Sequence, residues 1–456
     1  MKKLLIIATL AAVGMGACSK DDGVSAPEDL RKYVQVTIPE NAASGETRTS
    51  VDGTTTSWVA GYKVAVSLYN GSTTEVCEFT VDRTGATTTF SGSVPVGSYT
   101  CAAAHYPFCA ATFDAVNKTF THTWGDAYCS TDLAAYDFMF STVYETPFVV
   151  DETTTVLPIA LTFRPLMARI GMKLALGANE TPKYVTFTTD DNVLPTAGTV
   201  NADGTFSASA LTNSLTVETD RKEFTVGLLP VGVASKMSVH VTTTDGMTYS
   251  DKSFQLAGLK RNTHYTMNVP CRTKRFMLTV PDGVNSKYGT GTYKNNEFYS
   301  VDPATDPTGI FKDWYFYRAE LKNTTNTARG DKLKGKNRIQ LQVALGGNNS
   351  NNGAFVTAPI QCDGTKTVTV SFTAATNRAI SANYWIGVTD NGSITSDWLR
   401  DINKISPHAE GLIPRSDNVS HSHTFTVTNG QRIMVKVSNT LGEHHLEFAD
   451  FTYTVE

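Results

Sequence analysis

The sequence lacks the pattern of an α-helical protein, because apolar residues almost nowhere recur with a period near 3.6 residues. Short segments such as Tyr33–Ile38 and Lys63–Tyr69 alternate apolar and polar residues instead, and Gly, Asn, Asp and Pro separate them. This alternation is typical of β-strands with one buried face. A chain of 456 residues is long for one core, so we expect an all-β protein of two or three domains.

Charge and catalytic motifs are scarce as well. Charged residues make up 18% of the chain, with 39 basic and 43 acidic residues, so the basic excess of a nucleic-acid-binding protein is missing. The sequence contains no nucleophile elbow, P-loop, dinucleotide fingerprint or HExxH motif. A glycosidase would need two carboxylates at a fixed separation, and no such pair stands out. We therefore expect a protein that is not an enzyme.

Cysteine is rare, and its spacing is irregular. None of the seven cysteines forms a CxxC pair, which argues against a structural zinc site. Cys109 and Cys129 flank one loop-like segment. A disulfide between them and two buried free thiols both fit the sequence.

The N-terminus carries the features of an export signal. Lys2 and Lys3 precede the apolar run Leu4–Val13, which is too short to span a bilayer, so residues 1–17 fit a signal peptide. Gly16 and Ala17 directly before Cys18 resemble the bacterial lipobox, in which the cysteine thiol is acylated. The alternative is an ordinary cleaved signal followed by a chance cysteine.

Acylation at Cys18 would place the protein at a membrane, because two or three acyl chains give durable attachment whereas one gives only marginal binding. Residues 18–31 are polar and fit a tether. Ser19–Asp22 resembles the short signal that sends lipoproteins of Bacteroidetes to the cell surface, although it also fits a plain linker. We expect a lipoprotein of the outer membrane that is exposed on the cell surface or in fimbriae.

Seven weak motifs between residues 30 and 271 occur in a fixed order. The motifs are, in chain order, Thr47-Arg-Thr49, Trp58 with Gly61, Tyr99 through Tyr106-Pro107, Asp137-Phe-Met139, Leu161-Thr-Phe163 with Ala168, Leu229-Pro230 and Leu256 to Tyr265. Together with the lipobox they resemble the fimbrillin (Mfa-like) family of Bacteroidetes. The resemblance implies two transthyretin-like β-sandwiches, at residues 32–160 and 161–271, with Phe163 near the start of the second.

The pattern changes beyond the basic, turn-like segment Pro270–Arg275. Residues 276–456 contain longer alternating runs and more aromatic residues, and eight expected strands fit a jelly roll. The segment Gly353–Ile360 resembles jelly-roll domains attached to carbohydrate-active or adhesive surface proteins. The final run Leu446–Val455 would close this domain. Within the second sandwich, Ser207–Asn213 is expected to hold one short helical turn.

Aromatic residues of the jelly roll are the candidates for ligand binding, because sugar rings stack on flat aromatic faces. On one strand Trp314 and Phe316 would face one side, and Tyr315 and Tyr317 the other, so one pair is expected in the core. A packing role for each residue is the alternative to binding a glycan or protein ligand. The candidates are Trp398, Trp385, Tyr384, Tyr315 and Tyr317.

Metal binding is left open by the sequence. His421 and His423 would share one face of a strand, which is a possible metal-ligand spacing. Aspartate oxygens suit a structural calcium ion, although exposed loops are often rich in aspartate for other reasons. The aspartate candidates are Asp302, Asp306, Asp313 and Asp363.

Arg48 follows the first expected strand in a polar loop. The family resemblance implies that an arginine-specific protease cuts there, removes the strand and opens a groove for a strand from another pilus subunit. Arg31, Arg83 and an ordinary surface role for Arg48 are the alternatives. Because Leu446–Val455 would close its own domain, we expect a fimbrial tip or accessory subunit. The alternative function is a non-polymerising, glycan-binding surface lipoprotein.

Overall fold

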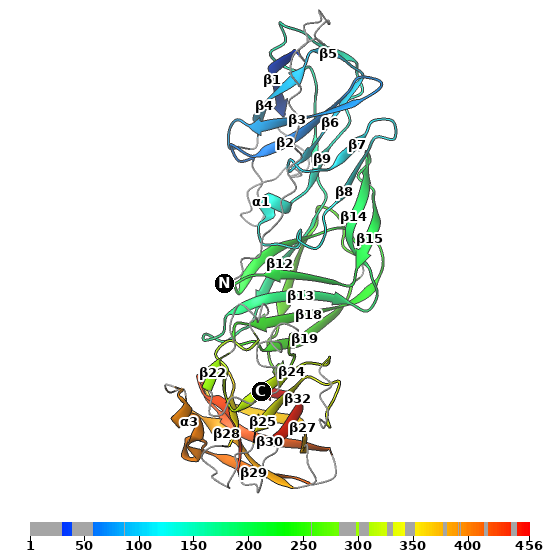
Figure 1. The fold of residues 1–456 in the computed structure, drawn as a ribbon. Helices are drawn as coiled ribbons and strands as arrows, with labels where there is room; N and C mark the ends of the chain where they lie inside the picture. Colours follow the sequence, from blue (N-terminus) through cyan, green and yellow to red (C-terminus); the bar gives the residue numbers. More distant parts are fainter. Residues whose placement is uncertain are drawn as a thin grey trace, which may run out of the picture.

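The protein is built almost entirely of β-strands, which form three units that follow one another along an elongated molecule (Figure 1). The computed structural model describes residues 30–38, 58–85, 87–256, 258–281, 298–300, 310–325, 332–342, 352–376, 381–390, 392, 394–414, 418–438 and 445–456. No helix within these residues is long and apolar enough to cross a membrane. The predicted fold class, two β-sandwiches followed by a jelly roll, is confirmed.

The first sandwich is built on an antiparallel sheet with strand order β1-β4-β3-β2-β6-β9-β11, while β10 pairs with β5. Trp58 lies at the centre of its core, with its ring 4.9 Å from that of Phe90 and 5.1 Å from that of Phe163. The elements are β1 (Arg31–Ile38), β2 (Lys63–Tyr69), β3 (Thr74–Val81), β4 (Thr88–Pro95), β5 (Gly97–Tyr99), β6 (Cys101–Tyr106), α1 (Leu133–Tyr136), β9 (Met139–Ser141), β10 (Phe148–Val150) and β11 (Phe163–Pro165).

The second sandwich combines sheets of order β17-β12-β20, β16-β13-β18-β19 and β15-β14-β8-β7. Its core is separate from that of the first sandwich. The elements are β7 (Thr112–Asp114), β8 (Thr119–Thr123), β12 (Ala168–Leu174), β13 (Pro182–Thr189), β14 (Leu194–Asn201), β15 (Phe206–Thr212), β16 (Ser214–Glu218), β17 (Glu223–Leu228), β18 (Ser235–Thr243), β19 (Thr248–Leu256) and β20 (His264–Val269).

The two sandwiches exchange chain segments at their border. The hairpin β7–β8 precedes the last strands of the first sandwich in sequence, yet β8 pairs with β14, and Phe113 and Phe120 lie in the second core. Phe163, expected near the start of the second sandwich, pairs with Ser141 in the first sheet. The change of core falls between Phe163 and Leu166.

The expected helical turn at Ser207–Asn213 is wrong. Residues 206–212 form β15, which pairs with β14 along most of its length. Most of its side chains are exposed, so the segment lacks the alternation of burial that marks a strand in sequence. Pairing with β14, rather than local propensity, decides its conformation.

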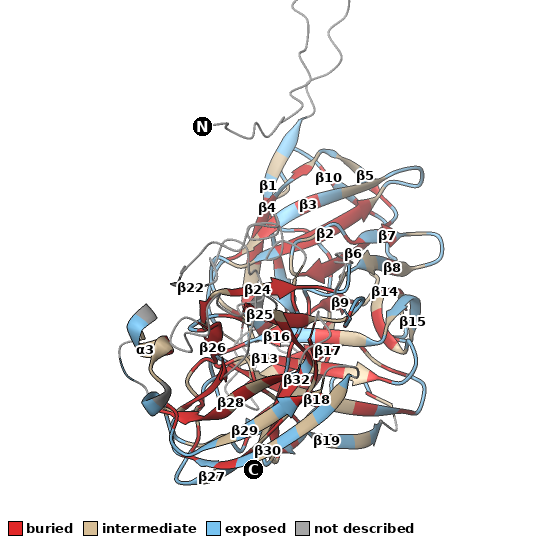
Figure 2. Cartoon of the chain, turned by 60° about the horizontal axis from the view of Figure 1, so that its bottom comes forward, coloured by how far each residue is buried: buried red, intermediate tan, exposed pale blue. Residues whose placement is uncertain are grey.

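The jelly roll packs the sheet β22-β23-β26-β31-β28-β29 against strands β24, β25, β27, β30 and β32. Strands such as β28 and β32 are buried along most of their length (Figure 2). The elements are β21 (Lys274–Met277), β22 (Phe298–Ser300), β23 (Tyr315–Tyr317), β24 (Ala319–Lys322), β25 (Arg338–Gln342), β26 (Ala354–Val356), β27 (Lys366–Thr376), β28 (Ala382–Thr389), α3 (Ser396–Arg400), η2 (Ile402–Lys404), β29 (His408–Ile413), β30 (Val419–Val427), β31 (Arg432–Val437) and β32 (His445–Val455).

Strand β21 joins the second sandwich to the jelly roll. Its first residues pair with β19, and all four pair with β32, so one sheet runs without a break from the sandwich into the jelly roll. Lys274 and Phe276 point inward and are buried, whereas Arg275 and Met277 point to the outer face and are exposed. We call this continuous layer the shared sheet.

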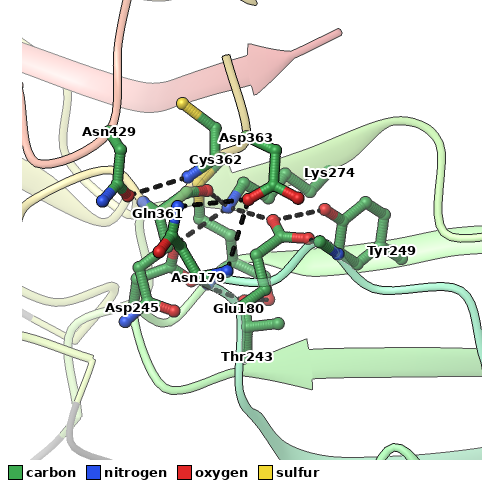
Figure 3. A network of polar contacts seen from close by, with 12 residues as sticks. Asn179, Glu180, Thr243, Asp245, Tyr249, Lys274, Gln361, Cys362, Asp363 and Asn429 are labelled. Carbon is green, nitrogen blue, oxygen red and sulfur yellow. Dashed lines mark hydrogen bonds and ion pairs between the residues drawn. The ribbon is translucent and has the colours of Figure 1, made fainter.

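A buried lysine on β21 lies at the centre of a polar network between the two units (Figure 3). Lys274 Nζ is 2.7 Å from Glu180 Oε1 and 3.0 Å from Asp245 Oδ2, and it donates to the main-chain oxygen of Gln361. The Lys274, Glu180 and Asp245 side chains are 2%, 6% and 3% exposed. Tyr249 donates to Glu180 Oε1 over 2.6 Å. Burial, followed by this hydrogen bond, raises the pKa of the Tyr249 phenol.

Further contacts support this junction. The Asp363 carboxylate of the jelly roll accepts hydrogen bonds from the main-chain nitrogens of Ala178, at 2.7 Å, and Asn179, at 3.3 Å. These bonds lower the pKa of Asp363. The Gln361 main-chain nitrogen donates to Asp245 Oδ2 over 3.2 Å. The second sandwich and the jelly roll are therefore held in one orientation by a shared sheet and by paired charges.

Replacing Lys274 with Met tests the junction. We expect Lys274→Met to destabilise the junction by about 3 to 5 kcal/mol, because Glu180 and Asp245 would remain buried without a cation. The expected result is a lower urea midpoint for the unfolding of the second sandwich and the jelly roll, together with faster proteolysis between residues 270 and 281.

Lys173→Met is the matched control, since Lys173 pairs with Glu223 at 2.7 Å while both side chains are about two-thirds exposed. Water solvates that pair, so its loss should leave the midpoint unchanged. Equal midpoints for the two variants would contradict the role assigned to Lys274.

Candidate functional site

Strand β1 forms one boundary of the first sheet and pairs antiparallel with β4 along all eight of its residues. Val34, Val36 and Ile38 point into the core and are at most 1% exposed. On its other side, the Gln35 main chain exchanges two hydrogen bonds with residues 155 and 157, at 2.9 and 2.8 Å. One strand near the N-terminus thus covers a large apolar strip of the first core.

The contacts of β1 indicate which main-chain groups and apolar sites its removal would expose. The main-chain groups of β4 that now pair with β1 would lose their partners, and the sites of Val34, Val36 and Ile38 would open to water. An unpaired strand edge above an apolar strip is a template for another strand. This edge can therefore accept a strand of matching alternation if β1 leaves.

Two of the sequence-predicted site residues, Cys18 and Arg48, lie outside the described residues. The alternative cleavage site Arg31 lies within β1, where its guanidinium donates to Glu75 at 3.1 Å and to the Ser93 main-chain oxygen at 2.9 Å. Arg83 lies in the turn between β3 and β4, where Thr88 Oγ1 donates to its main-chain oxygen over 2.8 Å. The Arg31 backbone also pairs with Pro95 of β4, and the Arg83 main-chain nitrogen donates to Thr88 Oγ1, so both alternatives lie in hydrogen-bonded backbone.

The last strand of the described chain, β32, lies inside the jelly roll. On one side it pairs with β25 at residues 445–449 and with β21 at residues 452–455. On the other side it pairs with β27 over most of its length. Phe448, Phe451 and Tyr453 belong to the main core and are at most 1% exposed. The expectation that Leu446–Val455 closes the jelly roll agrees with this pairing.

The aromatic residues predicted to bind a ligand divide into two groups. Tyr384 is 0% exposed and lies in the main core, where its hydroxyl is 2.8 Å from His423 Nε2. Tyr317 is 1% exposed and lies under the other face of the same sheet. Neither ring presents a face to solvent. Burial raises the pKa of the Tyr384 phenol.

Trp385, Trp398 and Tyr315 come together on the outer face of the sheet that contains β23, β31 and β28. All three are partly exposed and pack against a small apolar cluster beneath α3. The Arg432 guanidinium lies 5.6 Å from the centre of the Tyr315 ring. As the alternation predicted, Trp314 and Phe316 face the opposite way, into the main core.

The short helix α3 packs on part of this outer face through Leu399. Thr395 caps α3 by accepting a hydrogen bond from the Trp398 main-chain nitrogen, at 3.2 Å. Lys436 beneath it is 1% exposed, and its Nζ is 3.4 Å from the main-chain oxygens of Asn352 and Leu399. Burial lowers the pKa of Lys436 to about 8. Trp398, which belongs to α3, and Trp385 thus lie on a face that α3 already covers in part.

The metal and cysteine candidates are used differently. Within the described ranges, no three His, Cys, Asp or Glu side chains are placed to hold a metal ion. His421 and His423 share one face of β30, and burial lowers the pKa of both. Asp363 belongs to the junction network, Asp313 lies just before β23, and Asp302 and Asp306 lie outside the described residues. Cys109 and Cys129 are free thiols.

The junction is the feature that sequence reasoning missed. The sequence predicts a basic turn at Pro270–Arg275, whereas Lys274–Met277 is a strand. The signal was present, because Lys274-Arg-Phe276-Met alternates inward and outward positions once Lys274 is accepted as buried. A lysine is almost never fully buried unless paired, so its inward position could not be inferred without its partners.

Comparison with known proteins gives structural matches of low sequence identity. No curated protein sequence matches the chain. Among solved structures, a candidate cell adhesion protein from Bacteroides uniformis is 17% identical, with a TM-score of 0.36 over 54% of this chain and 94% of that chain. One from Bacteroides fragilis is 9% identical, with a TM-score of 0.30 over 56% and 95%. A xylan-binding domain from Paenibacillus barcinonensis is 12% identical, with a TM-score of 0.21 over 31% and 85%.

The family model gives a clear result. The model of the fimbrillin-like proteins matches residues 47–283, which is more than half of the 456 residues. The matched range contains Trp58 and most of the first sandwich, without strand β1, and the second sandwich with strand β21. The chain therefore belongs to the fimbrillin-like family, as its ordered sequence motifs predicted.

Proposed function

We propose that this protein is a fimbrial tip or accessory subunit that accepts a strand in its first sandwich and donates none from its C-terminus. Membership in the fimbrillin-like family supports a role in cell adhesion at the surface or in fimbriae, and points to a non-catalytic structural protein. The observation that carries the finer proposal is the position of β32, which is paired on both sides inside its own jelly roll.

The acceptor part of the proposal rests on β1. This strand is joined to the rest of the chain on its C-terminal side by residues 39–57, a range that includes Arg48. A cut at Arg48 would leave β1 held by its pairing with β4, by the two hydrogen bonds of Gln35 with residues 155 and 157, and by the burial of Val34, Val36 and Ile38. An incoming strand with the same alternation of apolar side chains can replace each of these interactions.

The donor part follows from β32. A donor strand must be free to leave its own subunit, but the removal of β32 would take Phe448, Phe451 and Tyr453 out of the core. The removal of β32 would also leave main-chain groups of β25 and β27 unpaired. The cost of this exposure keeps β32 in its own subunit, so growth of a fibre would end at this protein.

The lipid anchor fits the same scheme. Acylation of Cys18 would tie the N-terminal segment to the outer membrane, with residues 18–31 as the tether. Because Arg48 follows β1, a cut there would separate the anchored segment and β1 from the remaining chain once another strand takes the place of β1. One cleavage would thus couple release from the anchor to assembly with other pilus subunits.

A second candidate function is a glycan-binding surface lipoprotein that never assembles. Trp385, Trp398 and Tyr315 favour it, because they lie on one face of the jelly roll and remain partly exposed. In that case the chain would keep β1 after exposure to protease and would take up no foreign strand. The next two experiments separate the two functions.

Cleavage by an arginine-specific protease is the first test. We expect the folded chain to be cut after Arg48 well before Arg31 or Arg83, because both of the latter lie in hydrogen-bonded backbone. Intact-mass measurement at successive times identifies the cut. Arg48→Gln should abolish the early cut, and a folded chain that resists at Arg48 contradicts the pilus role.

Strand uptake is the second test. A fluorescent peptide with the sequence of residues 30–40 should bind the cleaved protein and exchange with the resident β1, whereas the uncleaved protein should bind none. The same peptide with Val36→Asp is the matched control, since it would bury an unpaired carboxylate in the core. Equal fluorescence anisotropy with both peptides would contradict an acceptor groove at this position.

Truncation of one core side chain tests the role of β32. We expect Phe448→Ala to destabilise the jelly roll by about 3 to 5 kcal/mol, because Phe448 is 0% exposed and packs against the rings of Phe372 and Tyr384. The urea midpoint of the jelly roll measures this change. Leu412→Ala is the control, since Leu412 is 56% exposed; a similar midpoint for both variants would indicate a dispensable last strand.

A further inference from the structure

The outer face of the shared sheet carries a continuous row of side chains from the second sandwich to the jelly roll. Tyr184 on β13 lies opposite Thr242 on β18, which lies opposite Thr248 on β19, which lies opposite Arg275 on β21. Two residues further along β21, Met277 lies opposite Thr452, and Thr452 lies opposite Ser371. With neighbouring strands about 4.8 Å apart, the row extends over roughly 24 Å.

Two cavities follow this row and meet on β21. One, of about 650 Å³, is lined by Tyr184, Thr242, Thr248 and Arg275. The other, of about 480 Å³, is lined by Thr452 and Ser371, and both cavities include Arg275 and Met277. We call the two cavities together the junction groove. Its floor is the same part of β21 that Lys274 holds from the inner side.

The floor of the junction groove is mostly hydroxyl groups with a few apolar surfaces. Thr242 Oγ1 and Thr248 Oγ1 lie 3.0 Å apart, and Ser371 Oγ donates to Ser422 Oγ over 3.2 Å. A hydroxyl both donates and accepts, so such a row can exchange its mutual bonds for bonds to another set of hydroxyls. Tyr184 provides a partly exposed ring, and Met277 is 62% exposed.

The charge at the centre of the junction groove is positive. Within the described part of the chain, no ion pair involves Arg275, which is exposed on the groove floor. Lys183 lies at one end with its Nζ 5.0 Å from the centre of the Tyr184 ring, and Lys336 at the other end pairs with Asp450. A guanidinium in a groove attracts planar carboxylates, which it can bind through two parallel hydrogen bonds.

We propose that the junction groove binds an extended acidic polysaccharide, with a uronate carboxylate at Arg275 and sugar hydroxyls along the threonine and serine row. Tyr184 would stack on the C–H face of one sugar ring. An acidic peptide fits less well, because a peptide strand binds through main-chain groups at a sheet edge. The junction groove instead presents side chains in the middle of the shared sheet, with β21 paired on both sides.

The inference deepens the proposed adhesive role by naming a ligand class, and it uses a face that strand uptake leaves untouched. The junction groove lies on the second sandwich and the jelly roll, whereas β1 lies at the edge of the first sandwich. Loss of strand uptake would therefore leave polysaccharide binding intact, and the failure of one proposal is distinguishable from that of the other.

Calorimetric titration of the full chain with polygalacturonate tests the proposal. We expect binding that weakens with added salt, because charges are screened, and much weaker binding of the neutral methyl ester of the same polymer. Arg275→Gln should weaken binding about tenfold or more, since it removes a charge-assisted hydrogen bond. Tyr184→Ala should weaken binding of the polymer as well, without altering its dependence on salt.

Arg83→Gln is the matched control, because Arg83 is exposed in a turn of the first sandwich; its affinity should equal that of the unaltered chain. Both arginine side chains are exposed, so neither change is expected to affect folding, and circular dichroism verifies this. The proposal is overturned if the unaltered chain does not bind polygalacturonate, if Arg275→Gln binds equally well, or if polyglutamate binds as tightly as the polysaccharide.

Discussion

The architecture depends on one buried cation. Lys274 lies almost without solvent contact between Glu180 and Asp245, and each of the three charges would be costly to bury alone. The groups of this network come from three places: the second sandwich, strand β21 and the jelly-roll segment at Gln361. Because no single unit satisfies these groups, the second sandwich and the jelly roll must pack together for either side of the junction to be stable.

Strand β21 links this buried interaction to the surface of the protein. The alternation of a β-strand sends Lys274 and Phe276 inward and Arg275 and Met277 outward. The inner pair fixes the orientation of the two units, and the outer pair occupies the place where the two cavities meet. A surface that spans two units can have a defined shape only when the units do not move against each other, and the buried network provides that condition.

The two ends of the described chain differ in how they are bound. Strand β1 lies at a sheet boundary, and its main chain pairs fully with β4 alone. Strand β32 is paired on both flanks and contributes several rings to the largest core. Replacement of β1 requires one new strand, whereas loss of β32 would dismantle a domain. This asymmetry is the physical basis for the proposal that the subunit receives a strand without giving one.

Local alternation in the sequence determined the all-β class, most strand positions and the opposite directions of Trp314 and Tyr315, because side-chain direction along a strand depends only on neighbouring residues. Pairing between distant strands was decided by the tertiary structure. It makes β15 a strand against β14, moves Phe113 and Phe120 into the second core and leaves Phe163 in the first. The partners of Lys274 are 94, 29 and 87 residues away in sequence. Only the folded chain brings such groups together, since their attraction acts over a few ångströms and leaves no periodic trace in the sequence.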